Sequence, residues 1–359
     1  MTATPELNPL GLLLYCRPGF EKECSAEIIH QAGLGGVHGY VSAAENSGFV
    51  RFFPQKGGGL KELQRNLRFS DLIFARQWVF ILGWLENLPA EDRLTPLMAL
   101  IQGCHSRFSE LLLETADTND AKALSVFLRK FAVPLRLALE REQLLGYGYH
   151  PRLHVFFLSA TSVCVGYTDP NNASPLLMGI PRLKLPRGAP SRSTLKLDEA
   201  FQVFVHQPDF ALRPAMTAVD LGAAPGGWTF QLVKRHIRTI AVDNGPLDPD
   251  LLESGIVEHL RVDGFRYRPA KPVDWLVCDM VEQPARIAAL VAEWLGHGWC
   301  RQAIFNLKLP MKKRYESVLE CRALMEARLA RCEFHYRLEF RQLYHDRAEI
   351  TGYIVRLDT

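Results

Sequence analysis

The segment AVDLGAAPGGWTFQLVKR, residues 218–235, carries the clearest chemical pattern in the chain. A short apolar run ends at Asp220, a glycine-rich turn follows, and the pattern then predicts an amphipathic helix. An acid at the carboxyl end of a strand lies where open α/β sheets bind ligands. Gly222, Gly226 and Gly227 let the backbone approach a ligand, and the helix start offers unpaired N–H groups to an anion. The turn therefore predicts a site for an anionic, nucleotide-like ligand.

The spacing of the glycines narrows the choice of ligand. The turn is not a Walker A loop, because no G-K-[ST] follows, and its glycines do not match the G-x-G-x-x-G fingerprint of nicotinamide-dependent enzymes. Asp243 ends the next predicted strand about 20 residues on, where an acid can accept hydrogen bonds from ribose hydroxyls. A ligand with a ribose and a carboxylate but no pyrophosphate suits both the glycine turn and Asp243. S-adenosyl-L-methionine is such a ligand.

The run D-L-G-A-A-P-G-G-W-T resembles the cofactor loop of the RrmJ/FtsJ-type ribose 2′-O-methyltransferases. A proline before the double glycine, followed by tryptophan and threonine, is far more specific than a lone glycine pair. Asp263, in LRVDGF, lies where the third strand of that family contacts adenine, and its alternative role is that of a turn residue. The resemblance implies that the cofactor is bound by Ser191, Asp220, Gly222, Ala223, Ala224, Pro225, Gly226, Gly227, Trp228, Asp243, Asp263 and Asp279.

Four residues match the Lys-Asp-Lys-Glu tetrad of the same family in the right order. Lys196 lies on the predicted helix before the first strand of this region, in SRSTLKLDE. Asp279 and Lys308 end two predicted strands, in DWLVCDM and FNLKLP, and Glu349 begins the last one, in HDRAEITGYIV. Each residue taken alone could instead be a solvated lysine, a helix cap or a hairpin charge. Their order beside this loop favours a catalytic set.

The implied reaction is methyl transfer to a ribose 2′-hydroxyl, which needs no metal but does need a group that takes the proton. An ordinary lysine, with a pKa of about 10.4, is charged and cannot accept one. A second lysine, the positive charge of the cofactor and partial burial would all lower that pKa. By resemblance, we expect Lys308 to be the base or direct partner of the hydroxyl, oriented by Asp279. Lys196 and Glu349 would position the ribose, and the sequence alone does not rank the two lysines.

Regular alternation of predicted strands and helices after residue 192 indicates the scaffold that holds these residues. Such alternation is typical of a mostly parallel sheet covered on both faces, and the last two strands predict an antiparallel hairpin at its edge. The predicted fold class is α/β, with a Rossmann-like S-adenosylmethionine-dependent methyltransferase domain over residues 193–359.

The N-terminal half is predicted to be α+β, and GGG at 57–59 marks a boundary near residue 60. Its order resembles a ferredoxin-like subdomain over 1–60 and a THUMP RNA-binding domain over 61–169. Over the whole chain, including YCRPGFEKEC near its start, the sequence resembles the RlmM family of bacterial 23S rRNA cytidine 2′-O-ribose methyltransferases. The resemblance implies large-subunit (23S) ribosomal RNA as the partner.

Residues 170–192 are rich in Pro, Gly and Asn and therefore predict a linker. The linker concentrates positive charge, with no acid between Asp169 and Asp198. A solvated linker and an RNA contact both fit this run, and its position next to the glycine turn supports the second. The candidate RNA-binding residues are Arg182, Lys184, Arg187 and Arg192.

Composition restricts the class of protein. Of the 359 residues, 48% are hydrophobic and 23% charged, as in soluble globular proteins. The net charge is only +3, so any RNA-binding surface must be local. No apolar run approaches the roughly 20 residues that span a membrane. Eight scattered cysteines without C-x-x-C indicate reduced thiols rather than disulfides or a metal site. We expect a cytoplasmic monomer.

Three other functions compete with this interpretation. The main one is a non-catalytic RNA-binding or ribosome-assembly factor on a methyltransferase fold, which should lack the tetrad or the glycine loop. A nicotinamide-dependent oxidoreductase requires a different glycine spacing. A base methyltransferase should carry an N-P-P-Y-type or catalytic-cysteine motif, and neither is evident.

Overall fold

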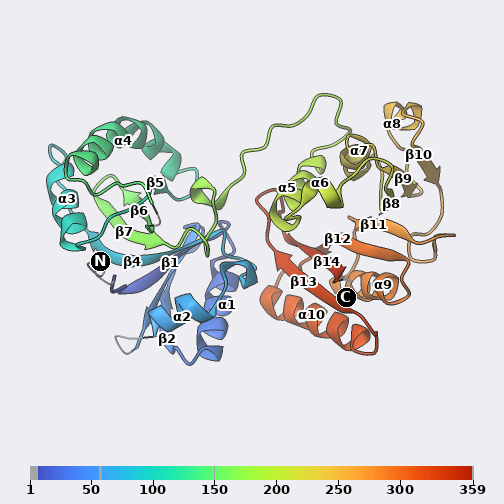
Figure 1. Cartoon of the computed structure of the whole chain (residues 1–359), viewed down its shortest axis with the longest axis horizontal. Helices are drawn as coiled ribbons and strands as arrows, with labels where there is room; N and C mark the ends of the chain where they lie inside the picture. The colour runs from blue at the N-terminus through green and yellow to red at the C-terminus, as the bar shows by residue number, and fades with distance from the viewer. Residues whose placement is uncertain (1–6, 56–58, 149, 358–359) are drawn as a thin grey trace. The chain divides into compact units, whose positions relative to one another are not determined.

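The structure is a computed structural model that describes residues 7–55, 59–148 and 150–357. It divides into two compact units, Met1–Ile180 and Pro181–Thr359 (Figure 1). Each unit is built on one seven-stranded sheet.

The sheet of the first unit has the strand order β2-β3-β1-β4-β7-β6-β5. Its elements are β1 (Gly11–Tyr15), α1 (Glu21–Leu34), β2 (Gly39–Ser42), β3 (Phe49–Pro54), α2 (Leu60–Asn66), η1 (Phe69–Asp71), β4 (Gln77–Leu85), α3 (Leu94–Gly103), β5 (Leu111–Thr115), η2 (Ala121–Ala123), α4 (Leu124–Arg141), β6 (Arg152–Ser159), β7 (Ser162–Thr168) and η3 (Leu177–Gly179). The central strand β1 is buried along its length, as its apolar run GLLLY requires.

The first part of this unit has a ferredoxin-like arrangement. β1 pairs antiparallel with both β3 and β4, and β2 pairs antiparallel with β3, which gives the order βαββαβ from β1 to β4. The boundary predicted near residue 60 falls within this order, between β3 and α2. β4 also pairs with β7, so one sheet continues into the second part of the unit.

Residues 170–180, at the start of the predicted linker, pack onto the first unit. The side-chain oxygen of Asn172 accepts a hydrogen bond from the backbone N–H of Phe69 at 2.7 Å, and its carbonyl accepts one from Trp78 Nε1 at 2.6 Å. The N–H of Met178 donates to the buried carboxylate of Glu114 at 2.6 Å. The second unit therefore begins at Pro181, inside the predicted linker.

The second unit carries a sheet in the order β10-β9-β8-β11-β12-β14-β13. Its elements are α5 (Thr194–Phe204), α6 (Pro208–Ala211), β8 (Thr217–Leu221), α7 (Gly227–Val233), β9 (Arg238–Val242), α8 (Pro249–Glu253), β10 (Val257–Leu260), β11 (Val273–Cys278), α9 (Pro284–Gly296), β12 (Cys300–Lys308), α10 (Arg314–Leu329), β13 (His335–Arg341) and β14 (Glu349–Leu357). The strands from β10 to β12 are parallel, whereas β14 is antiparallel to both β12 and β13. The predicted fold class is confirmed.

Helices cover both faces of this sheet (Figure 1). α5 and α7 share one core with the strands, in which Phe201 and Trp228 pack with Trp275. α9 and α10 lie on the other face (Figure 1). The strand order reverses between β8 and β11, so the loops that follow these two strands lie side by side at a switch point, where open α/β sheets bind ligands.

Candidate active site

The glycine loop leaves the carboxyl end of β8 and is tied to the end of β9. Asp243 Oδ2 accepts a hydrogen bond from the N–H of Ala224 at 3.0 Å, and its Oδ1 accepts one from Gly245 at 2.7 Å. Gly222 and Gly226 have φ angles of +80° and +117°, which side-chain-bearing residues rarely adopt. The segment between them, from Ala223 through Pro225, thus forms a turn at the switch point that is held by the carboxylate of Asp243.

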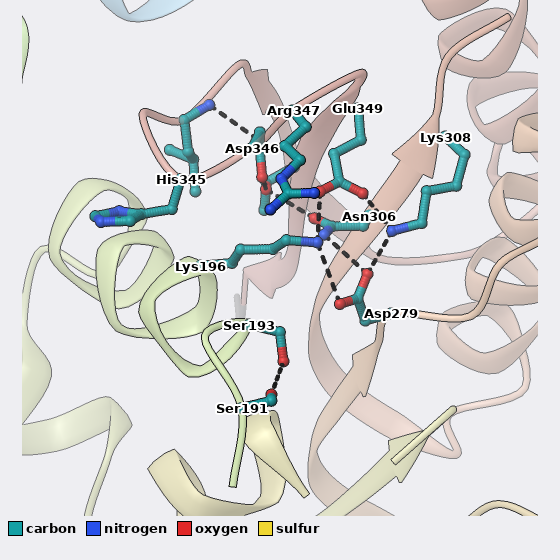
Figure 2. A network of polar contacts seen from close by, with 12 residues as sticks. Ser191, Ser193, Lys196, Asp279, Asn306, Lys308, His345, Asp346, Arg347 and Glu349 are labelled. Atoms are coloured by element: carbon teal, nitrogen blue, oxygen red, sulfur yellow. Dashed lines mark hydrogen bonds and ion pairs between the residues drawn. The ribbon is translucent and has the colours of Figure 1, made fainter. Parts of the chain in front are cut away.

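Ser191 packs against Gly227 at the start of α7, and its role in cofactor binding stays a prediction. A Cβ atom on Gly227 would lie 2.3 Å from the hydroxyl oxygens of both Ser191 and Ser193. These two hydroxyls are hydrogen-bonded at 2.7 Å (Figure 2). Gly227 is therefore required for close approach, and the end of the linker is fixed to the loop. The next residue, Trp228, is buried in the core.

Asp220 is fully buried beneath the loop. Its Oδ2 accepts a hydrogen bond from Thr229 Oγ1 at 2.6 Å, whereas Oδ1 has no hydrogen-bond partner among the described residues. Burial, helped by the nearby Asp279, raises the pKa of this carboxyl to about 7. Asp220 therefore takes up a proton at a much higher pH than an ordinary aspartic acid.

Asp263 lies in the loop after β10. Its exposed carboxylate accepts a hydrogen bond from the N–H of Phe265 at 2.8 Å, so it holds a turn, as its alternative role predicts. The adjacent Gly264 lies against Met280, because a Cβ there would be 3.0 Å from the methionine sulfur. The loop therefore borders the switch point, and a role in adenine binding stays a prediction.

The four tetrad residues meet in one ring of alternating charge (Figure 2). Lys308 Nζ lies 2.7 Å from Asp279 Oδ1 and also contacts Glu349. Lys196 Nζ lies 3.3 Å from Asp279 Oδ2 and contacts the other oxygen of Glu349. Lys308 and Glu349 are register partners on β12 and β14, so strand pairing itself places this pair.

Burial and the opposing charges set the protonation states of the ring. Burial alone would lower the pKa of Lys308, but the carboxylates of Asp279 and Glu349 outweigh it and raise that pKa. Burial raises the pKa of Glu349, and the two lysines lower it more, so the net direction is downward. The raised pKa of Lys308 is opposite to the lowering that we expected. In the free protein Lys308 is charged and cannot accept a proton.

Asn306 extends the ring on one side, and the sequence analysis missed it. Its Nδ2 donates to Asp279 Oδ1 at 3.0 Å, and its Oδ1 accepts from Thr351 Oγ1 at 2.8 Å. Thr351 also lies 3.0 Å from the buried carboxyl of Asp346, whose pKa is raised by burial and by Glu349. Asn306 stands two residues before Lys308, so the two-residue period of a strand could have indicated it.

Glu199, on α5, is a second residue that the sequence analysis missed. Its side chain is buried and accepts hydrogen bonds from the backbone N–H groups of Tyr344 and His345, at 2.8 and 2.9 Å. Its Oε2 also lies 2.6 Å from the imidazole Nδ1 of His345. The helix that carries Lys196 thereby holds the turn that leads to Glu349.

The candidate RNA-binding residues are exposed. Three of them lie on the segment before α5, and the last stands between the two serines at the glycine loop: Arg182, Lys184, Arg187 and Arg192. Within residues 7–55, 59–148 and 150–357, no group of three His, Cys, Asp or Glu side chains could hold a metal ion. No helix in the same residues is long and apolar enough to cross a membrane.

The fold and the site together define a class of enzyme. An open, mostly parallel sheet carries the glycine loop at its switch point, ends in an antiparallel hairpin and presents the charged ring beside the loop. These are the features predicted for a Rossmann-like methyltransferase that uses S-adenosyl-L-methionine.

Comparison with known proteins gives the family. Three family models match, described as RlmM ferredoxin-like domain over residues 10–79, Ribosomal RNA large subunit methyltransferase M, N-terminal, over 92–169, and FtsJ-like methyltransferase over 189–336. The chain is 60% identical over 348 residues to Ribosomal RNA large subunit methyltransferase M of Methylococcus capsulatus, covering 97% of this chain and 98% of the relative. The protein of that name from Cellvibrio japonicus is 50% identical over 345 residues, covering 96% and 98%. The chain belongs to the ribosomal RNA large subunit methyltransferase M family.

Proposed function

We propose that this protein transfers a methyl group from S-adenosyl-L-methionine to the ribose 2′-hydroxyl of a cytidine in 23S ribosomal RNA. The observation that carries the proposal is the ring of two lysines and two carboxylates beside the glycine loop (Figure 2). The relatives are named for the RNA of the large ribosomal subunit, which supports the class of substrate.

The loop fits the cofactor. A Cβ on Gly222 would lie 2.8 Å from the side chain of Met280, so only glycine lets the loop pack this closely against the segment after β11. Each oxygen of Asp243 already accepts one backbone hydrogen bond, and a carboxylate oxygen can accept a second, here from a ribose hydroxyl. When bound, S-adenosyl-L-methionine supplies a methyl group on a positively charged sulfur.

Within the ring, Lys308 takes the proton of the 2′-hydroxyl at its Nζ. That atom must first be neutral, so one proton passes from the partly exposed Lys308 to solvent before transfer begins. Asp279 Oδ1, at 2.7 Å, fixes the direction of Nζ, and Asn306 fixes the same carboxylate from the other side. Lys196 contacts both carboxylates, so one cation remains between them while Lys308 is neutral.

Transfer of labelled methyl groups tests the proposal. The acceptors are 23S ribosomal RNA from cells that lack this protein and the same RNA from cells that contain it. We expect one methyl group per molecule in the first RNA and almost none in the second, which is already modified. Tight binding of cofactor and RNA without transfer to either would support the non-catalytic assembly factor instead.

The N-terminal unit and the linker are proposed to bind the RNA. The ferredoxin-like and THUMP-like segments would recognise the shape and the phosphates of structured RNA. The protein would act as a cytoplasmic monomer. Reversal of charge at Arg182, Lys184 and Arg187 should weaken RNA binding and leave cofactor affinity unchanged, because all three are exposed before α5. An unchanged RNA affinity and salt dependence would remove the linker from the RNA-binding surface.

A further inference from the structure

A hollow of about 640 Å³ lies within the N-terminal unit, between α2 and the segment that follows β7. Three cationic side chains line it, namely Lys61, Arg65 and Arg68. The start of the predicted linker contributes Asn171, Asn172 and Ala173 to the lining, whereas the methyltransferase ring contributes no residue. It is therefore a separate candidate binding site.

The pattern of α2 explains why the cations face the hollow. Lys61 and Arg65 recur at i and i+4, which places them on one side of α2, and Arg68 lies in the extended backbone after the helix. Leu60 and Leu63, at i and i+3, are buried against the unit, and Leu67 directly after the helix is buried as well. Burial of the leucines thus fixes the rotation of α2 about its axis, so that Lys61 and Arg65 face the hollow.

The opposite wall is held in place before any ligand binds. Asn172 donates from Nδ2 to the carbonyls of Gln64 and Leu67, at 3.1 and 3.0 Å, and accepts from the N–H of Phe69 at 2.7 Å. These bonds join the segment after β7 to α2 on both sides of the hollow. A site fixed in this way loses little entropy when a ligand is bound.

The lining combines charge, amide groups and aromatic edges. The lining contains one acid, Asp169, and Arg68 also pairs with Asp71 at 3.1 Å, so the three cations exceed the two acids by one charge. Phe69 and Tyr167 also line the hollow although both are largely buried, and Asn171 is exposed. The volume falls within the roughly 300–1,000 Å³ of ligand sites and exceeds what one phosphate fills.

We propose that this hollow binds one nucleotide of a single-stranded segment of the substrate RNA. Lys61, Arg65 and Arg68 contact the phosphates on either side, while the base enters the hollow against Phe69 and Asn171. The inference rests on the proposed function, because it takes RNA as the ligand. It adds the place at which the N-terminal unit holds an unpaired nucleotide.

Two variants and one matched control test the site. Lys61→Glu/Arg65→Glu/Arg68→Glu reverses the charges of the lining. Arg129→Glu/Lys130→Glu/Arg136→Glu makes the same change at exposed positions of α4, and Ser70→Trp fills the hollow without changing charge. Filter binding to unmodified 23S ribosomal RNA over a range of salt concentrations gives affinity and salt dependence. Cofactor affinity and circular dichroism show that each variant is folded.

We expect the first variant to bind RNA at least about tenfold more weakly, with a salt slope smaller by about 1.4, since each of the two phosphates on a single strand contributes about 0.7. The Ser70→Trp variant should lose affinity with its slope nearly unchanged, and the α4 control should stay near the wild type. Equal losses in the two triple variants, or full affinity in Ser70→Trp, would overturn the inference while wild-type methylation stands. A wild type that neither binds nor methylates this RNA would overturn the proposed function itself.

Discussion

Replacement of Lys308 tests whether the ring supplies a base or only a charge. Lys308→Ala removes both the proton acceptor and one cation, and leaves two carboxylates facing Lys196 alone. Lys308→Arg retains the cation, but arginine does not lose its proton in proteins. The two substitutions therefore separate proton transfer from electrostatic balance.

The contacts of Lys308 give the size of the effect. General-base catalysis contributes about 10²–10⁴-fold, so both variants should lose turnover by about this factor if Lys308 takes the proton. The bond to Asp279 at 2.7 Å is charged, and its loss costs roughly 1.5–3 kcal/mol of stability. That is below the roughly 5–15 kcal/mol of a typical domain, so the alanine variant should fold.

Single-turnover methylation at saturating cofactor measures the rate, and calorimetry measures cofactor affinity separately. We expect slow transfer and near-normal cofactor affinity in both variants. Near-normal turnover in Lys308→Ala would remove Lys308 from the mechanism. Near-normal turnover in Lys308→Arg alone would assign it an electrostatic role and refute proton transfer to its Nζ.

Three further predictions follow from pKa shifts and close contacts. Because the pKa of Lys308 is raised in the free protein, its neutral fraction grows about tenfold per pH unit. A plot of log kcat/KM against pH should therefore rise with a slope near one, and Lys308→Ala should abolish that slope. Burial raises the folded-state pKa of Asp220 to about 7, so its contribution to stability is present below the unfolded pKa of about 4 and is lost as pH rises through 7. Urea unfolding of the wild type should therefore show the free energy of unfolding fall by up to ~4 kcal/mol between about pH 4 and pH 8, and Asp220→Asn should not show this fall. The same pH dependence in both proteins would contradict the raised pKa of Asp220. Gly227→Ala places a methyl group 2.3 Å from the hydroxyls of Ser191 and Ser193, and a cost of about 1–3 kcal/mol should weaken cofactor binding roughly 5–150-fold by calorimetry. An unchanged affinity would show that the loop yields freely to the added methyl group.

The scaffold of the second unit was predictable because its signals are local. Apolar runs that end in an acid or a lysine alternate with amphipathic helices, and parallel strands bring such ends to one edge of a sheet. The ring followed because Asp279 and Lys308 stand at the ends of adjacent strands, and Glu349 begins the strand that pairs with β12. The resemblance to known methyltransferases supplied the choice of these positions among all charged residues.

Other features depend on distances that a linear pattern does not contain. The direction of the Lys308 pKa shift is set by two carboxylates within contact, which outweigh burial. Asn306 joins the site through its register with Thr351, and Glu199 through a turn 145 residues away in sequence. Likewise, the pairing of β4 with β7 makes one sheet of two segments that appear separate in the sequence.

The identity of the methylated nucleoside tests the central claim most directly. Unmodified 23S ribosomal RNA would be incubated with the protein and labelled S-adenosyl-L-methionine, digested to nucleosides and separated. The account predicts label in 2′-O-methylcytidine alone, and its loss in Lys308→Ala. Label on a base, or on the ribose of another nucleoside, would contradict the proposed chemistry or the proposed target.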